Sequence, residues 1–160
     1  LTRMLRVDKL TDMALEYTLR LFLAPDTLWE KNPTLRMLAK PLALLDQEAA
    51  SLLNLIQRSC PAICARVLAG ESAVGGGSLP DSPLPTCLIG IRCDKVTPAA
   101  LARKLRFHEP PVVARIQDDE LLLDVRTLLP DDDAVITHAL ASIFEYADST
   151  TTFREKDIAH

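Results

Sequence analysis

No apolar run in this chain of 160 residues is long enough to cross a lipid bilayer, because charged residues or prolines interrupt every one. Because the sequence starts at Leu1 rather than at Met, we expect it to be a piece of a longer polypeptide, and the lack of a signal-peptide pattern therefore excludes nothing. A basic excess is also lacking, because 18 Lys and Arg stand against 22 Asp and Glu. We therefore expect this chain not to be the main contact for a nucleic acid, and we expect no membrane partner.

Cysteine is scarce, and neither of its two common structural uses, a disulfide framework or a zinc site, is expected. The four cysteines are Cys60, Cys64, Cys87 and Cys93. A chain that is 48% hydrophobic needs no disulfide framework, so reduced and mostly buried thiols are expected, as is a cytoplasmic location. A zinc site would need tight pairs of ligands, which this spacing does not provide, so no metal is expected.

The first 60 residues contain the patterns of helices. Residues 11–24 carry apolar side chains at helical spacing, with Thr11 as the predicted N-cap and Pro25 as the end. Asn32 and Pro33 are typical of a second helix start. A longer helix is predicted over residues 41–59, with an apolar stripe of Leu42, Leu45, Ala49, Leu52, Leu53 and Ile56.

Strand patterns begin after residue 60. Strands are predicted at 62–77, 86–94, 111–117 and 120–128, with a helix over 97–110 capped by Thr97 and a closing helix over 129–147. Asp118 and Asp119 between the last two strands favour a hairpin turn. The order is therefore helices first and then β-β-α-β-β-α.

This order predicts an α+β fold with a largely antiparallel four-stranded sheet and helices on one of its faces. Three parts are expected along the chain: a helical segment at 1–60, an α+β domain at 61–148 and a flexible tail at 149–160. The tail has one aromatic residue, Phe153, and no apolar periodicity, so it is expected to stay unpacked.

Three motifs each allow a structural and a functional interpretation. Gly75–Ser78 could cradle a phosphate, but no helix start follows it, so a tight backbone crossing is favoured. Asp131–Asp133 could hold a metal, but acidic residues are also typical of a helix start, which is the interpretation we prefer. The densest basic cluster is expected to be a solvated helix end, and it consists of Arg103, Lys104, Arg106 and His108.

No catalytic constellation is evident from motifs alone. His108 and His138 lack the partners of a Ser/His/Asp or Cys/His arrangement. Arg115 differs because it lies in the middle of an apolar strand, where a charged residue either pairs on the solvent face or reaches into a ligand site. The residue pattern leaves both possibilities open.

Several segments together resemble the C-terminal part of the bacterial L-seryl-tRNA(Sec) selenium transferases, or selenocysteine synthases. The resemblance covers residues 1 to about 147 and departs from the family's usual residues at Ala73 and Ala114. Its most specific segments are LRVDKLTDMALEYTLRLFL (5–23), PTLRML (33–38), SAVGGGSLP (72–80) and PPVVARIQDDELLLDVRTLLP (110–130).

The resemblance implies the small C-terminal domain of a fold-type-I pyridoxal-phosphate enzyme that forms ring-shaped homo-oligomers. Such an enzyme converts seryl-tRNA(Sec) to selenocysteinyl-tRNA(Sec) with selenophosphate, and its cofactor forms a Schiff base with a lysine. That lysine is expected upstream of Leu1, so no catalytic residue and no bound pyridoxal 5'-phosphate are expected in this chain. None of its own lysines has the required context: Lys9, Lys31, Lys40, Lys95, Lys104 and Lys156.

The resemblance also assigns roles to three arginines. Arg3 and Arg6 lie one helical turn apart, and by spacing alone a solvated pair is the simpler interpretation. Their match to the family's active-site arginines implies instead that they hold selenophosphate. In related enzymes a small-domain arginine binds the substrate carboxylate, but here that carboxylate is esterified, so Arg115 is expected to contact the ester carbonyl.

Two other functions remain open at this point. The chain could belong to another aminotransferase-like enzyme that acts on a free amino acid, or it could be an interaction module without catalytic activity.

Overall fold

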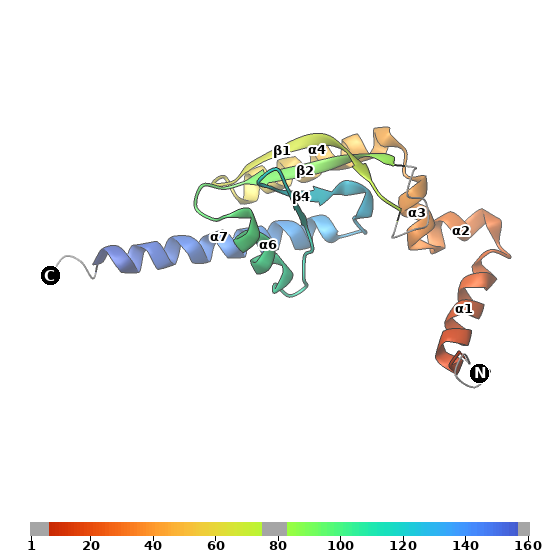
Figure 1. Ribbon diagram of the computed structural model, residues 1–160. Helices are drawn as coiled ribbons and strands as arrows, with labels where there is room; N and C mark the ends of the chain where they lie inside the picture. Colours follow the sequence, from red (N-terminus) through yellow and green to blue (C-terminus); the bar gives the residue numbers. More distant parts are fainter. Residues whose placement is uncertain (1–6, 75–82, 157–160) are drawn as a thin grey trace. The chain divides into compact units, whose positions relative to one another are not determined.

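The computed structural model describes residues 7–74 and 83–156, with side chains up to residue 144. Arg3, Arg6 and Gly75–Ser78 lie outside the described residues. The chain divides into two compact units, Leu1–Lys40 and Pro41–His160. Figure 1 shows the helices and strands of both units along the chain. This division falls before the helix over 41–59 rather than at the predicted residue 60, because the apolar stripe of that helix belongs to the core of the sheet.

The first unit contains the helices α1 (Lys9–Leu21), α2 (Pro25–Lys31) and α3 (Pro33–Ala39). The predicted cap of α1 is wrong: the Asp8 carboxylate accepts hydrogen bonds from the backbone N–H groups of Leu10 (2.9 Å) and Thr11 (3.0 Å). Aspartate serves as well as threonine at this position, so the helix starts three residues earlier than the motif indicated.

Helix α2 was not predicted, because Pro25 was interpreted only as the end of the preceding helix. Proline is favourable at the first position of a helix, because a backbone N–H at that position would have no acceptor within the helix and its loss costs nothing. The predicted start of α3 is confirmed, with the Asn32 side chain accepting from the Leu35 N–H at 3.1 Å. Helix α1 buries none of its side chains.

The second unit is built on a four-stranded antiparallel sheet in the order β1-β2-β4-β3. The strands are β1 (Cys64–Ser72), β2 (Leu84–Arg92), β3 (Arg115–Gln117) and β4 (Glu120–Asp124). Asp118 and Asp119 have φ values of 51° and 57°, as a two-residue type I′ turn requires, so the predicted hairpin is confirmed.

Strands β3 and β4 are shorter than predicted. Strand β3 begins only at Arg115, and β4 gives way after Asp124 to a 3-10 helix, η1 (Val125–Thr127). The Asp124 carboxylate ends the strand by accepting from the N–H of Arg126 at 3.1 Å. The same carboxylate accepts from the hydroxyls of Ser72 (2.6 Å) and Thr86 (2.7 Å), so one side chain ties β4 to β1 and β2.

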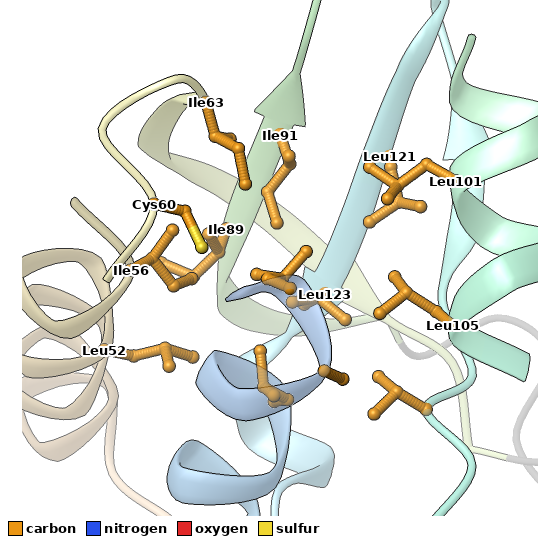
Figure 2. Close-up of a cluster of buried hydrophobic side chains, with 14 of the residues drawn as sticks. Leu52, Ile56, Cys60, Ile63, Ile89, Ile91, Leu101, Leu105, Leu121 and Leu123 are labelled. Carbon is orange, nitrogen blue, oxygen red and sulfur yellow. The ribbon is translucent and has the colours of Figure 1, made fainter. Parts of the chain in front are cut away.

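Helices α4 (Leu42–Ser59), α6 (Pro98–Arg106) and α7 (Asp132–Lys156) contribute to one apolar core with the sheet. The predicted Thr97 cap of α6 is confirmed, because its side chain accepts from the Ala100 N–H at 3.3 Å. Figure 2 shows side chains from α4, β2, β4 and α6 meeting in this core, among them Leu52, Ile56, Ile89, Ile91, Leu101, Leu105, Leu121 and Leu123. The predicted helices on one face of an antiparallel sheet are therefore confirmed.

Helix α7 runs further than predicted. It continues through Lys156, so residues 149–156, expected as part of a flexible tail, have a helical backbone. Its described contribution to the core ends at Phe144. Within the described ranges no helix has both the length and the apolar character needed to span a membrane.

Candidate functional site

A hollow of about 530 Å³ lies on the face of the sheet that the helices do not cover. Alternation along β2 and β4 sends Ile89, Ile91, Leu121 and Leu123 into the core and turns the residues between them to this open face. The lining of the hollow combines aliphatic side chains with charged and amide ones. Its charged and amide side chains from four strands and one turn are Arg66, Arg92, Arg115, Gln117, Asp118 and Glu120.

The Glu120 carboxylate is the centre of this charged group. Glu120 is only 3% exposed, and it accepts from Arg66 Nε at 3.1 Å and from Arg66 Nη2 at 2.8 Å. Arg92 approaches the same carboxylate, with Nη2 3.7 Å from Oε2, and donates to the Asp118 carbonyl at 3.2 Å. One buried carboxylate thus orients two guanidiniums that are each 54% exposed.

The backbone leaves room for this carboxylate at Gly90. A Cβ atom at that position would lie 2.5 Å from Oε1 of Glu120, closer than van der Waals contact allows. The hydrogen bonds from Arg66 lower the pKa of Glu120, and they outweigh the effect of burial, which acts in the opposite direction. Glu120 is therefore ionised near neutral pH and holds the two arginines by charge.

Arg115 lies on β3 at the other side of the hollow and is exposed. Its Nη1 and Nη2 atoms are 3.5 and 3.4 Å from the Glu71 carbonyl oxygen, which makes both hydrogen bonds long. Among the residues that the structure describes, no carboxylate forms an ion pair with Arg115. The structure therefore places Arg115 at a hollow with most of its N–H donors available. The sequence pattern had left open whether Arg115 pairs on the solvent face or reaches into a ligand site.

The arrangement favours anions over cations. Three guanidiniums face the hollow, and Glu120 is already paired with Arg66 and Arg92. Alternation along β1 turns the Glu71 side chain away from this face, so three guanidiniums stand against two carboxylates, those of Glu120 and Asp118. The Asp118 carboxylate accepts from the Gln117 amide at 3.3 Å. Guanidinium groups carry several N–H donors in a fixed plane, which suits phosphate and carboxylate oxygens.

The other predicted motifs lie away from this hollow. Asp132 and Asp133 are in the first turn of α7, which confirms the interpretation of the acidic triplet as a helix start. Arg103, Lys104 and Arg106 are in the last turn of α6, as predicted.

His108 and His138 lie side by side, which no motif had indicated. Their rings meet edge-on with centroids 5.4 Å apart. The Nδ1 atom of His108 is 2.9 Å from the carbonyl oxygen of Pro110, so an N–H at this position donates to the loop backbone. This contact accounts for His108 as a structural residue.

All four cysteines are free, but only Cys60 and Cys87 are buried; Cys93 is half-buried and Cys64 is exposed. Burial and the hydrogen bond from its Sγ to Asp46 (2.9 Å) raise the pKa of Cys87 to about 11, so this thiol stays protonated. In the part of the chain that is described, no group of three or more His, Cys, Asp or Glu side chains is arranged to hold a metal ion.

The sequence reasoning missed Arg66, Arg92 and Glu120. The available signal was the one used for Arg115: a charged residue that interrupts or ends an apolar strand. Which of these charges share a face depends on the register, in which Arg66 is opposite Gly90, Gly90 opposite Leu122 and Leu122 opposite Arg115. Pairing of strands distant in sequence cannot be read from a single strand.

Comparison with known proteins gives one consistent result. The family model for L-seryl-tRNA selenium transferase matches residues 1–129. The chain is 38% identical over 143 residues to the L-seryl-tRNA(Sec) selenium transferase of Aquifex aeolicus, covering 89% of this chain and 31% of that protein. The enzyme with the same name from Moorella thermoacetica is 42% identical over 150 residues, covering 92% of this chain and 32% of that protein. The one from Geobacter metallireducens is 43% identical over 144 residues, covering 89% of this chain and 31% of that protein.

The chain thus spans about a third of the length of these curated relatives. The match includes Arg3, Arg6 and all four strands, and it ends close to the start of α7. The chain belongs to the L-seryl-tRNA selenium transferase family.

Proposed function

We propose that this chain is the C-terminal part of an enzyme that converts seryl-tRNA(Sec) to selenocysteinyl-tRNA(Sec) with selenophosphate. The observation that carries the proposal is the family match over residues 1–129, supported by relatives near 40% identity that bear this name. Because the chain spans about a third of those relatives, the proposal concerns a longer protein. We place that protein in the cytoplasm, as a ring-shaped homo-oligomer.

The proposal includes pyridoxal phosphate as the cofactor and a fold-type-I architecture. When bound, this cofactor supplies an electron sink for the loss of the seryl hydroxyl. The residues described here do not fit its covalent attachment, because the hollow on the sheet is lined by no lysine. We therefore assign the attachment to the part of the enzyme outside this chain and derive no step from it.

This chain's own contribution is to bind and orient the two substrates. Arg3 and Arg6 are proposed to hold the phosphate of selenophosphate, for which two adjacent guanidinium forks provide donors to several oxygens. Arg115 is proposed to donate to the ester carbonyl of the seryl group. The available N–H groups of Arg115 at the hollow support this role.

A direct assay tests the proposal. The full-length protein would be incubated with pyridoxal phosphate, selenophosphate and either seryl-tRNA(Sec) or free L-serine, and the products identified by mass spectrometry. Selenocysteinyl-tRNA formed only from the tRNA substrate is the expected result. Turnover of free serine alone would favour an enzyme acting on free amino acids, and no turnover of either substrate would favour an interaction module.

A further inference from the structure

The Arg66–Glu120–Arg92 group has the construction of a binding site rather than of an ordinary surface ion pair. Its carboxylate is buried, whereas exposed pairs are usually mobile and contribute little. Gly90 supplies the space that this carboxylate needs. Burying a carboxylate to fix two guanidiniums at a surface has a cost in desolvation, and apolar side chains in place of the whole group would stabilise the sheet at least as well.

The geometry of the two arginines indicates what they can bind. Arg66 uses Nε and Nη2 on Glu120, so its other terminal nitrogen points elsewhere. Arg92 approaches the same carboxylate from 3.7 Å, which places the two guanidiniums close together. Two guanidinium edges beside each other suit a phosphate group, which offers oxygens to both.

The exposure of the site distinguishes a strand of nucleotides from a small free anion. Sites dedicated to small molecules bury most of their ligand's surface. Within this chain both arginine side chains remain about half exposed, so no residue of this chain encloses a ligand bound to them. Phosphates along a nucleic acid are bound in this manner, by contacts that position the strand without enclosing it.

The sheet register relates this site to Arg115. Arg66 and Arg115 lie in one row across four strands, so their backbones are about 14 Å apart along the sheet. In a seryl-tRNA the ester is at the 3′-terminal ribose, and the first phosphodiesters lie within a few nucleotides of it. A single strand laid across the hollow can therefore contact both sites.

We propose that the open face of the sheet binds the phosphodiester backbone of the tRNA acceptor end through Arg66 and Arg92, which Glu120 holds in place. This inference rests on the proposed function and deepens it, since Arg115 is assigned the adjacent ester. It also agrees with the net charge of −4, because one or two phosphate contacts supplement a main tRNA contact elsewhere in the enzyme.

The salt dependence of tRNA binding by the full-length enzyme tests the inference. Arg92→Gln removes one contact. Arg66→Gln is combined with Glu120→Gln, so that no buried carboxylate is left unpaired and the net charge of the protein is unchanged. For both variants, the slope of log K against log salt concentration for binding of tRNA(Sec) without an attached amino acid is expected to become shallower by about 0.7. Arg103→Gln/Arg106→Gln on α6 removes two charges outside the hollow and is expected to leave the slope unchanged.

One result would overturn the inference: a slope for the Arg92 and Arg66/Glu120 variants equal to that of the wild type. If that unchanged slope came with a raised KM for selenophosphate, the hollow would be assigned to the selenium donor. The proposed function would be refuted instead if the slope changed in the variants as expected but the wild-type enzyme formed no selenocysteinyl-tRNA.

Discussion

At the scale of single residues, Glu120 links the stability of the sheet to pH. Its pKa is lowered in the folded state by the hydrogen bonds from Arg66, so the pair contributes stability that is fully present above the usual glutamate pKa of about 4. That contribution is lost as the pH falls through the lowered pKa. We expect Glu120→Gln to reduce the free energy of unfolding at pH 7 by about 1–3 kcal/mol, and the reduction to shrink toward pH 3.

Urea denaturation of both proteins at pH 7 and pH 3 measures this effect. Glu109→Gln is a matched control, because Glu109 is exposed and its substitution is expected to change stability by less than about 0.5 kcal/mol. Equal losses for the two variants at pH 7 would show that burial of Glu120 has no energetic consequence.

Arg3 and Arg6 carry the prediction for the selenium donor. Alanine at either position in the full-length enzyme should impair the use of selenophosphate by about 2–3 kcal/mol, because charged hydrogen bonds to a desolvated phosphate are lost. Binding of seryl-tRNA should change far less. Lysine should rescue poorly, since a point charge does not replace the guanidinium fork. Steady-state kinetics with varied selenophosphate measure this, and unchanged kcat and KM in both alanine variants would refute the role.

Arg115 carries the prediction for the seryl ester. Arg115→Ala in the full-length enzyme should lower kcat/KM for seryl-tRNA(Sec) by about 2–10-fold, as expected for one lost hydrogen bond to a neutral carbonyl. Arg103→Ala removes an equivalent charge from the end of α6 and should have no effect. If both variants match the wild type, Arg115 is a structural residue.

A single residue of the site could be predicted only where the sequence of its own strand gives a signal, such as a charged residue within an apolar run. Arg115 stands out within PPVVARIQ without any knowledge of its neighbours. Glu120 lies 54 residues after Arg66, and it meets Arg66 and Arg92 only through the pairing of β1, β2 and β4, which local patterns do not specify. The role of Arg3 and Arg6 depends on the family resemblance and lies outside the described residues.

At the scale of elements, helix α7 separates a packed part from a dispensable one. Its buried residues in the described part are Ile136, Ala139, Leu140, Ile143 and Phe144. Deleting residues 149–160 should therefore leave the melting temperature unchanged, although the backbone is helical through Lys156. Leu140→Ala, which opens a cavity in the core, should lower the stability by about 2–5 kcal/mol and serves as the contrast. Thermal unfolding monitored by circular dichroism makes the comparison, and a loss of several degrees on truncation would show that the end of α7 docks.

The elements themselves were largely predictable, because their signals are local. Asn32, Thr97 and the Asp118–Asp119 turn all act as their sequence positions indicated. The errors occur where one residue type serves two purposes: Pro25 begins a helix as readily as it ends one, and Asp8 competes with Thr11 as a cap. The boundary at residue 60 differs because α4 packs against strands that follow it, and this long-range contact has no local signal.

At the scale of the whole molecule, this chain alone should neither bind pyridoxal phosphate covalently nor convert seryl-tRNA. The reason is that no lysine lines the hollow and none has the sequence context of a Schiff-base residue. Incubation with the cofactor should give no aldimine absorbance, and borohydride should trap no lysine. Trapping at one specific lysine of this chain would refute the assignment, whereas scattered low-level labelling of many lysines is the expected background.

The turn at Asp118–Asp119 has a consequence for how this surface can evolve. Side chains alternate between the two faces of a strand, so an extra residue that is not taken up by a longer loop or a bulge would shift one strand by one position. Such a shift would turn Arg115 or Glu120 into the apolar core and bring Ile116 or Leu121 to the open face. Insertions at this turn that shift the register should therefore be rejected by selection, while the exposed loop around Phe107 is free of this constraint.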